Sequence, residues 1–265
     1  MLLNKSLVDP IVTSLRSLGK ELLKRRDNHQ VDGEWFGTQL KSSADLLANE
    51  VITKCLTNLT PDLPIISEEN VTSQVENRPN LYWLIDPIDG TASYVNGFDG
   101  FVLQVALIEN ELPVLGIIYA PATNELFTAL RGQGAWKNGE KLKVISNSSN
   151  IRLIDNYPTP KGISEKLYKA LSPCEYIESG SLSLKMLRVF DGGADIFVKD
   201  VVVRDWDFAA PMAVCFELKG IISQFDGSPF SLKGNWEKNG VIVSRNDTLY
   251  KRTLLALDTL QEENR

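Results

Sequence analysis

The chain has 265 residues, of which 43 % are hydrophobic and 23 % are charged, a composition typical of a soluble globular protein. Its 28 lysines and arginines against 34 aspartates and glutamates give a formal net charge of −6, and this acidic balance without a basic block argues against binding of a nucleic-acid polymer. The longest strongly apolar runs, such as residues 101–108, are far shorter than the ~20 residues of a membrane-spanning helix, so we expect no insertion into a membrane.

The first part of the chain predicts two amphipathic helices. Apolar residues recur at helical spacing over residues 7–25 and again over about residues 44–59. Prolines end the second pattern, and a short strand is expected at residues 64–66. Between the helices, residues 25–38 are polar and show no periodic apolar face, so we expect a mobile loop there.

Residues 81–144 show the pattern of strands. Apolar or alternating runs separated by turn residues lie at 81–85, 101–109, 114–119 and 126–130. Asn138-Gly139, which stands between two short apolar segments, is a strong signal for a two-residue hairpin. This half of the chain is therefore predicted to consist of helices packed on an antiparallel sheet.

A cluster of serine and asparagine at residues 146–150 predicts a boundary, with one half over residues 1–145 and the other over 146–265. Beyond it, strand and helix patterns alternate, which indicates an α/β unit. Strands are expected at residues 151–155, 194–198, 221–225 and 241–243, and helices at 163–171, 182–190, 207–218 and about 248–262.

The cysteines and the histidine narrow the possible chemistry. Cys55, Cys174 and Cys215 form no CxxC pair, so we expect reduced, buried thiols and no disulfide frame or zinc site. His29 is the one histidine and lies in a polar run, so we expect it at the surface and expect no histidine-based triad or HExxH site. Reduced thiols, and first residues without the pattern of a secretory leader, predict a cytoplasmic protein.

The densest group of candidate residues is the string LYWLIDPIDGT. An apolar strand is expected to end at Asp86, and Pro87 and Gly90 then turn the chain so that Asp89 returns beside it. Thr91 stands where a helix could begin. Such a strand end suits a Mg²⁺–phosphate site, because Mg²⁺ prefers oxygen ligands and helix starts bind phosphate. A plain turn is the alternative, since Asp-Pro and Asp-Gly are common turn dipeptides.

Two further acidic strings follow expected element boundaries. Ser67-Glu68-Glu69 comes after an apolar pair, and Arg204-Asp205-Trp206-Asp207 opens a helix with Pro211 in its first turn. Taken alone, the first string is typical of a solvated turn or a helix cap. The second is typical of an N-cap, because acidic residues there match the helix dipole.

Together, these strings resemble the inositol monophosphatase superfamily of Mg²⁺-dependent, Li⁺-sensitive phosphatases. Along nearly the whole chain the resemblance is carried, in order, by Ala44-Asp45, SEE, WLIDPIDGT, GIIYAP, SGSLSLK, GGAD and WDFAAP. It implies the α+β / α/β layered αβαβα sandwich of that superfamily, with the active site between the two halves. A homodimer is one assembly that the resemblance allows.

The resemblance also implies a metal site. Glu68, Asp86, Asp89 and Asp207 would hold two or three Mg²⁺ ions per active site, with the carbonyl of Ile88 as a further ligand. Carboxylates that converge in one cleft repel one another and resist ionisation unless cations neutralise them. The implied reaction is in-line attack of a metal-activated water on a small phosphate monoester, and it needs no histidine.

Further roles follow from the same resemblance. Asp45 and Thr91, together with Glu68, would be catalytic and orient the attacking water, while the backbone N–H groups of Gly90 and Thr91 would hold the phosphate. Glu69 would lie near the first metal. Ser42 stands where the family more often has threonine, and a hydroxyl is retained.

Local strings favour one substrate. LTPDLPIISEE, YAPA and GS…LK are similar to bacterial 3′(2′),5′-bisphosphate nucleotidases, which convert adenosine 3′,5′-bisphosphate to AMP in sulfur metabolism. Lys185 falls where that subfamily carries lysine, and a cation suits a doubly phosphorylated nucleotide. Gly180 and Ser181 are expected to contact the substrate with it. The alternative for Lys185 is an exposed helix lysine.

Other residues keep alternatives open. Ala92-Ser93-Tyr94 matches neither the continuation typical of those nucleotidases nor that of the inositol enzymes. Asp200 falls where inositol monophosphatases place an acid against a sugar hydroxyl, although it could also meet a ribose hydroxyl or face solvent. Inositol 1-phosphate or another sugar or polyol monophosphate is therefore the second candidate substrate, and histidinol phosphate a third. A catalytically silent phosphate-binding module is the last alternative, and the presence of every matching carboxylate argues against it.

Overall fold

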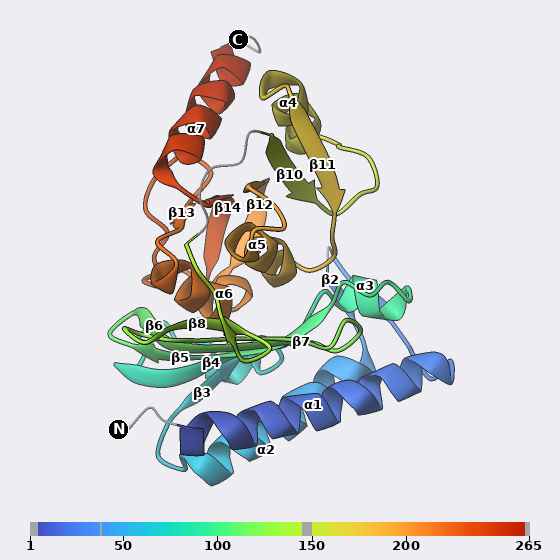
Figure 1. Ribbon diagram of the computed structural model, residues 1–265. Coiled ribbons are helices and arrows are strands. Elements are labelled where there is room, and N and C mark those ends of the chain that lie inside the picture. The colour runs from blue at the N-terminus through green and yellow to red at the C-terminus, as the bar shows by residue number, and fades with distance from the viewer. Residues whose placement is uncertain (1–4, 38, 145–149, 263–265) are drawn as a thin grey trace.

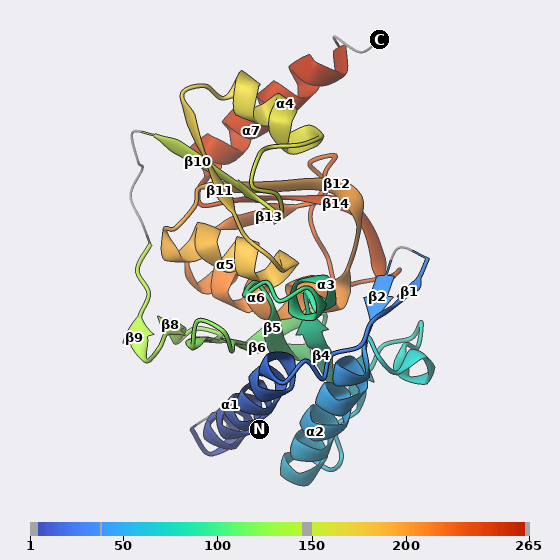
Figure 2. The ribbon, with the colours of Figure 1, turned by 90° about the vertical axis from the view of Figure 1, so that its right-hand side faces the viewer.

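The computed structural model describes residues 5–37, 39–144 and 150–262, and within them helices and sheets alternate in five layers (Figures 1 and 2). The layers are a pair of helices, a seven-stranded sheet, a second pair of helices, a five-stranded sheet and a third pair of helices. This arrangement is the predicted layered αβαβα sandwich.

The first layer consists of α1 (Lys5–Asp27) and α2 (Ser43–Leu59), which pack side by side under one face of the larger sheet (Figure 1). α1 turns one apolar stripe inward, formed by Leu7, Ile11, Leu15, Leu18 and Leu22. Their spacing of three or four residues is the helical period, and both predicted helices are confirmed.

The larger sheet has the strand order β3-β4-β5-β6-β7-β8-β9. Its strands are β3 (Ile65–Ser67), β4 (Leu81–Asp89), β5 (Val102–Glu109), β6 (Leu112–Ala120), β7 (Glu125–Leu130), β8 (Gly134–Lys137) and β9 (Glu140–Lys141). Neighbours pair antiparallel except β3 and β4, which are parallel, so the predicted antiparallel sheet is right except at this edge. The Asn138-Gly139 hairpin is confirmed, with φ of 51° and 84°, the left-handed values that such a turn requires.

The middle layer, α5 (Leu182–Asp191) and α6 (Asp205–Glu217), lies between the two sheets (Figure 2). The smaller sheet has the order β11-β10-β12-β14-β13. Its strands are β10 (Ile151–Asp155), β11 (Cys174–Glu178), β12 (Ile196–Arg204), β13 (Ile221–Ser223) and β14 (Glu237–Ser244), and α4 (Ile163–Ala170) and α7 (Asp247–Glu262) cover its outer face. The predicted alternation of strands and helices is confirmed.

Two strands of the smaller sheet differ most from the prediction. β12 continues to Arg204, well past the predicted end at residue 198, because an irregular stretch between Lys199 and Val202 joins two parts that both pair with β14. β11 has no counterpart among the predicted strands, since the edge strand Cys174–Glu178 is half polar and has no apolar run.

The expected loop at residues 25–38 ends in a short hairpin. β1 (Glu34–Phe36) pairs with β2 (Gln39–Lys41), and the hairpin lies beside α3 (Thr91–Val95) (Figure 1). The loop prediction is wrong for residues 25–27, which belong to α1, and for β1, while the mobility of the segment stays a prediction. A single turn of 3₁₀ helix, η1 (Val71–Ser73), follows β3.

The predicted boundary at residues 146–150 lies outside the described residues except for Asn150. The division into residues 1–145 and 146–265 therefore stays a prediction. The largest hydrophobic cluster does not follow this division, because it joins inner-face residues of both sheets to α5 and α6.

The free thiols are less uniformly buried than predicted. Cys215 is buried, whereas Cys55 and Cys174 are partly exposed, and all three are free. His29 is exposed, as predicted. Among the described helices, none combines the length and the apolar character of a membrane-spanning segment.

Candidate active site

Asp86 and Asp89 lie on either side of an irregularity in β4. Asp86 pairs with Gln104 of β5, whereas Asp89 pairs with Val102, so β4 has one residue more than its partner between these points. Pro87 follows Asp86 and has no N–H for the ladder, which favours such a bulge. The strand therefore does not end at Asp86, as the sequence predicts, but continues to Asp89. Both carboxylates are buried at its end.

Gly90 turns the chain from β4 into α3. Its φ is +94°, and a Cβ at this position would lie 2.9 Å from the Gly100 carbonyl oxygen and 3.0 Å from Ser181 Cβ. Only glycine meets both conditions without strain. α3 begins at Thr91, where the sequence predicts a helix start, and Thr91 Oγ1 lies 3.2 Å from the Ile88 carbonyl oxygen.

Asp45, in the first turn of α2, is a second partner of the Thr91 hydroxyl. Thr91 Oγ1 lies 3.0 Å from Asp45 Oδ1, and the backbone N–H of Ser42 donates to Asp45 Oδ2 at 2.7 Å. The Ser42 hydroxyl accepts from the backbone N–H of Ala44 at 3.2 Å, which completes a cap at the helix start. Burial is the main cause that raises the pKa of Asp45 to about 7.

Glu68 follows β3 and lies beside Asp86. The parallel register pairs Ser67 with Ile85, and the backbone N–H of Glu68 donates to the Ile85 carbonyl at 3.3 Å. The next residue, Glu69, forms an ion pair with Lys41 at 3.0 Å. The parallel edge pair, which the sequence pattern does not predict, thus brings the acids of the SEE string to the end of β4.

Asp207 lies in the first turn of α6, where the backbone N–H of Arg204 donates to its Oδ2 at 2.8 Å. The sequence predicts that Pro211 lies in the first turn of the helix. This prediction is wrong, because α6 begins at Asp205 and Pro211 lies inside it. Proline has no N–H to donate to the carbonyl four residues earlier. The Asp207 carbonyl instead lies 2.8 Å from the hydroxyl of Ser183 on α5.

The N-terminus of α5 points at Asp89. The backbone N–H groups of Leu182 and Ser183 donate to the two oxygens of Asp89 at 3.2 and 2.6 Å. Ser181 caps the helix by accepting from the backbone N–H of Leu184 at 3.1 Å, and its own N–H donates to the Gly100 carbonyl at 2.7 Å. α5 is therefore joined to the end of β4 directly and through the glycine contact.

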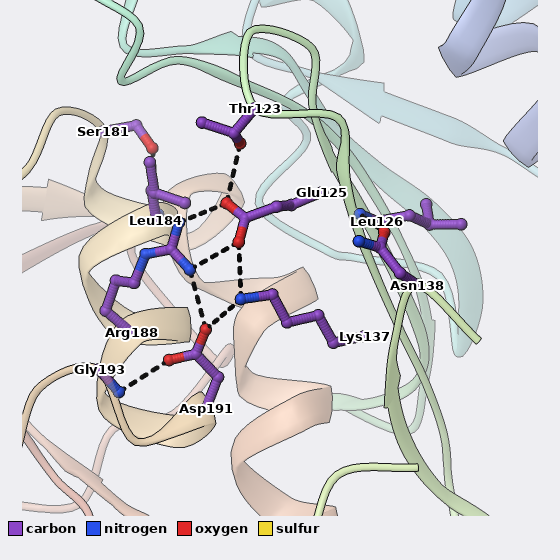
Figure 3. Close-up of polar contacts among 10 residues, drawn as sticks. All are labelled: Thr123, Glu125, Leu126, Lys137, Asn138, Ser181, Leu184, Arg188, Asp191 and Gly193. Atoms are coloured by element: carbon purple, nitrogen blue, oxygen red, sulfur yellow. Dashed lines mark hydrogen bonds and ion pairs between the residues drawn. The ribbon is translucent and has the colours of Figure 1, made fainter. Parts of the chain in front are cut away.

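The other end of α5 is fixed to the larger sheet by four alternating charges (Figure 3). Glu125 of β7 lies 2.9 Å from Arg188 and 2.6 Å from Lys137, and Asp191 lies 2.9 Å from Arg188 and 2.8 Å from Lys137. Arg188 and Asp191 belong to α5, whereas Glu125 and Lys137 belong to β7 and β8. The position of α5 is thus set at both of its ends.

Glu68, Asp86, Asp89 and Asp207 form a single group, which we call the carboxylate cluster. Burial is the first cause that raises the pKa of all four. Repulsion between members adds to it, since Glu68, Asp89 and Asp207 act on Asp86, and Asp89 and Glu68 act on Asp207. The pKa of Glu68 is raised to about 7. These carboxylates therefore lie close enough to oppose one another's ionisation.

The donor chemistry of the carboxylate cluster fits a hard cation. Asp86 Oδ1 is buried and has no hydrogen-bond partner among the described residues, while Gln104 Nε2 lies 3.3 Å from Asp86 Oδ2. A buried carboxylate oxygen without a donor suits Mg²⁺, which takes oxygen ligands. In the described part of the chain no three histidine, cysteine, aspartate or glutamate side chains are arranged as a ready metal-binding group. The assignment of ligands therefore stays a proposal.

Lys185 is buried behind this cluster, at 1 % exposure, which contradicts the alternative of an exposed helix lysine. Its ammonium donates to the Asn156 side-chain oxygen and to the Gly180 carbonyl. Burial lowers the pKa of Lys185 to about 7, against the favourable charges of Asp155 and Asp89. Asp200, in contrast, lies on an exposed, irregular part of β12.

Three polar residues of the site are absent from the sequence-based assignment. Gln104 lies on buried β5 and contacts both Asp86 and the Trp206 carbonyl, and Ser183 lies 2.8 Å from Gln104 Oε1. Asp32 accepts from the Ser42 hydroxyl at 2.8 Å, just outside the cluster. The one sequence signal that could have identified Gln104 is a single amide side chain in an otherwise apolar strand. Asp32 lies in a polar loop without a periodic pattern, so the sequence offers no such signal for it.

A cavity of about 630 Å³ adjoins the site between the β1–β2 hairpin and the start of α2. Its lining includes Asp32, Lys41, Ser42 and Glu69. Glu69 on its wall is the neighbour of Glu68 in the chain, so a small molecule could approach the carboxylates from this side.

Comparison with known proteins identifies relatives along almost the whole chain. A family model described as "Inositol monophosphatase family" matches residues 5–262. The 3′(2′),5′-bisphosphate nucleotidase CysQ of Aggregatibacter actinomycetemcomitans is 34 % identical over 199 residues, which are 72 % of this chain and 74 % of the relative. The Nus factor SuhB of Xylella fastidiosa is 32 % identical over 238 residues, 85 % of this chain and 84 % of the relative.

A solved structure confirms the likeness in three dimensions. An IMPase from Thermotoga maritima superimposes with a TM-score of 0.80 at 26 % identity, covering 96 % of this chain and 98 % of that one. The five layers described above are thus shared along the full length of a solved relative.

Proposed function

Since the chain belongs to the inositol monophosphatase family and is a phosphoric monoester hydrolase, we propose that it is a 3′(2′),5′-bisphosphate nucleotidase. It would release the 3′-phosphate of adenosine 3′,5′-bisphosphate and leave AMP. This family membership sets aside the alternative of a catalytically silent module. The proposal includes inhibition by Li⁺ and a place in sulfur metabolism in the cytoplasm, and it leaves a homodimer open.

Members of the family are generally Mg²⁺-dependent phosphatases. The carboxylate cluster and the Ile88 carbonyl would hold the metal, with two or three ions per active site. Bound Mg²⁺ would supply a Lewis acid that lowers the pKa of a water and offsets charge on the phosphoryl and leaving oxygens. Support for this assignment comes from the buried, unpartnered Asp86 oxygen and from the mutual repulsion within the cluster.

The chain's own groups would position the reactants. Asp45 and Thr91 share a hydrogen bond, and with a pKa of about 7 the Asp45 carboxyl can exchange a proton near neutral pH. Through the Thr91 hydroxyl it would orient a water for in-line attack on phosphorus. The backbone N–H groups of Gly90 and Thr91 would donate to the phosphate oxygens at the turn that Gly90 makes possible.

The buried ammonium of Lys185 is the observation that carries the substrate class. It lies beside Gly180 and within electrostatic reach of Lys199, which pairs with Asp155 at 2.5 Å. The Tyr157 ring adjoins this group, with Lys199 Nζ 6.0 Å from its centroid. Burial lowers the pKa of Lys185 to about 7, and a second phosphate bound beside it would favour its protonated form. The uncharged hydroxyls of an inositol ring would not.

The first prediction concerns Lys185→Met, which keeps the length of the side chain and removes its charge. We expect KM for adenosine 3′,5′-bisphosphate to rise roughly 10-fold or more, as for loss of a charge-assisted hydrogen bond. KM for 3′-AMP, which lacks the second phosphate, should change much less. Phosphate release under saturating Mg²⁺ measures both constants.

The matched control is Lys169→Met, since Lys169 is an exposed lysine that pairs with Glu165 on α4. It should leave both KM values unchanged. Equal losses on the two nucleotides in Lys185→Met would show that Lys185 does not recognise the second phosphate, and the substrate assignment would lose its main support.

A further inference from the structure

The first turn of α6 contains a second buried carboxylate, Asp205, that the proposed reaction does not use. Asp205 Oδ2 lies 2.6 Å from Arg78 Nη1, and Oδ1 lies 3.2 Å from Lys238 Nζ. All three side chains are at least nine-tenths buried. Burial of ions is costly and is offset only when opposite charges stay close. Neither Asp205 oxygen accepts a hydrogen bond in the described part of the chain, so the two ion pairs are what hold this arrangement of the helix start. We call Arg78, Asp205 and Lys238 the anchor cluster.

Arg78 also holds the loop of residues 232–236. Its guanidinium donates to the carbonyl oxygens of Leu232 and Gly234, the latter at 2.8 Å. It lies 3.5 Å from the centroid of the Trp236 ring, a close cation–π contact. One side chain thus joins the segment before β4 to the loop before β14.

Lys238 and the backbone of Asp205 close the same loop. Lys238 donates to the carbonyl of Asn235 and, at 3.2 Å, to that of Lys233. The backbone N–H of Asp205 donates to the Trp236 carbonyl at 3.0 Å. The anchor cluster therefore fixes the start of α6 through both its side chain and its backbone.

The helix geometry connects this anchor to the carboxylate cluster. Successive residues of an α-helix are rotated by about 100° around its axis. Residues 205 and 207 are therefore rotated by about 200° and point to nearly opposite sides of the helix. Asp205 is held on one side by Arg78. Asp207 is close enough to Asp89 and Glu68 for their charges to raise its pKa. A rotation of this first turn would move Asp207 away from its neighbours.

We propose that Arg78, Asp205 and Lys238 are positioning residues that set the Mg²⁺ affinity of the site by fixing the direction of Asp207. The inference rests on the proposed metal site. The anchor cluster, which lies outside the carboxylate cluster, would thus contribute to the Mg²⁺ affinity of the site.

The chain offers a matched control at the other end of β12. Asp195 is also buried between two cations, with Arg152 Nε at 3.0 Å and Arg245 Nη1 at 2.7 Å. It precedes β12, whereas Asp205 follows it, and a nine-residue strand spans roughly 30 Å. Loss of Asp205 leaves two buried cations, whereas loss of Asp195 leaves the buried Arg245 and the partly exposed Arg152. Only Asp205 lies within two residues of a carboxylate of the cluster.

The experiment measures Mg²⁺ binding to the full chain by isothermal titration calorimetry and by the rise of Tm with Mg²⁺, neither of which needs turnover. Asp205→Asn is expected to raise Kd for Mg²⁺ about tenfold, at the lower end of the range typical when a group that supports a metal ligand is lost. Arg78→Gln is expected to raise Kd as well, because it removes the same anchor.

A purely electrostatic influence would have opposite signs in these two variants. Loss of the negative charge of Asp205 would weaken Mg²⁺ binding, whereas loss of the positive charge of Arg78 would strengthen it. Weaker binding in both supports positioning, and tighter or unchanged binding in Arg78→Gln overturns it. If Asp205→Asn does not fold, Arg78→Gln and Lys238→Met carry the same test.

Asp195→Asn separates positioning from general destabilisation. It should lower Tm as Asp205→Asn does, while Kd for Mg²⁺ stays within about twofold of the unchanged chain, because distant sites act nearly independently. An equal loss of Mg²⁺ affinity in Asp195→Asn would overturn the inference alone. Absence of Mg²⁺ binding by the unchanged chain would overturn the proposed function itself.

Discussion

Asp89 accepts hydrogen bonds from two backbone N–H groups of α5 and is also one of the proposed metal ligands. Asp89→Asn keeps the size of the side chain and one acceptor oxygen. We expect it to reduce kcat by more than about 100-fold, the upper end for residues that only support a ligand, while the fold is retained. Phosphate release and circular dichroism give the two results.

Asp62→Asn, at an exposed aspartate after α2, is the control for this variant and should behave as the unchanged chain. If Asp89→Asn kept near-normal turnover, Asp89 would not be a metal ligand. If it unfolded, the bonds to α5 would be the main role of this carboxylate.

Asp45 and Glu68 give a pH prediction for the protein without metal. Burial raises the pKa of each to about 7, whereas both are ordinarily near 4. The folded chain therefore binds more protons than the unfolded chain between about pH 4 and 7, and this contribution to stability is lost as pH rises through that range. In EDTA, we expect Tm to fall by a few degrees per pH unit there.

Mg²⁺ should reverse this dependence, because it binds the ionised carboxylates and stabilises the folded state more as they deprotonate. Melting curves at pH 5, 6 and 7 in EDTA and in Mg²⁺ make the comparison. Identical slopes in the two series would mean that these carboxylates do not bind the metal.

At the scale of the elements, α5 is fixed to the larger sheet through Glu125. Burial opposes ionisation of Glu125, but hydrogen bonds from Arg188 and Lys137 outweigh it and lower the pKa to about 2. Glu125→Gln removes these charge-assisted contacts, and we expect the free energy of unfolding to fall by about 1–3 kcal/mol at pH 7. Urea denaturation measures the change.

The sign of the pH effect is the opposite of that for Asp45. Because the pKa of Glu125 is lowered in the folded state, its contribution is present above the ordinary value near 4.5 and is lost as pH falls toward 2. The difference between the unchanged chain and Glu125→Gln should therefore shrink at pH 3. A difference independent of pH would contradict this account. Glu165→Gln, at an exposed pair with Lys169, should leave the free energy of unfolding nearly unchanged, because solvent screens exposed ion pairs.

Periodic elements could be predicted from the sequence, whereas irregular ones could not. The apolar stripe of α1 and the Asn138-Gly139 turn each depend on local residue types, and both are present. The continuation of β4 to Asp89 depends on pairing with β5 across a bulge, which no local pattern encodes. The same holds for the edge strand β11, which has no apolar run and is a strand because it pairs with β10.

For the whole molecule, the resemblance that the motifs carry implies the five layers, which the structure confirms, and the strands and helices proposed to supply acids to the site. The sequence does not reveal how the two sheets meet. The contact of Asp89 with α5, the Gln104 amide beside Asp86 and the burial of Lys185 all join segments that are distant along the chain. Asp200, which the resemblance suggests for a sugar hydroxyl, lies on an exposed segment.

The central claim is that this chain hydrolyses a bisphosphate nucleotide in a Mg²⁺-dependent reaction. The most direct test is the initial rate of phosphate release from adenosine 3′,5′-bisphosphate and from inositol 1-phosphate, side by side, in Mg²⁺ and in EDTA. We predict Mg²⁺-dependent release with a kcat/KM at least about tenfold higher for the nucleotide, since a charge-assisted contact to the second phosphate contributes about 1.5 kcal/mol or more. Preference for inositol 1-phosphate would contradict the substrate assignment, and equal rates in EDTA would contradict the metal site.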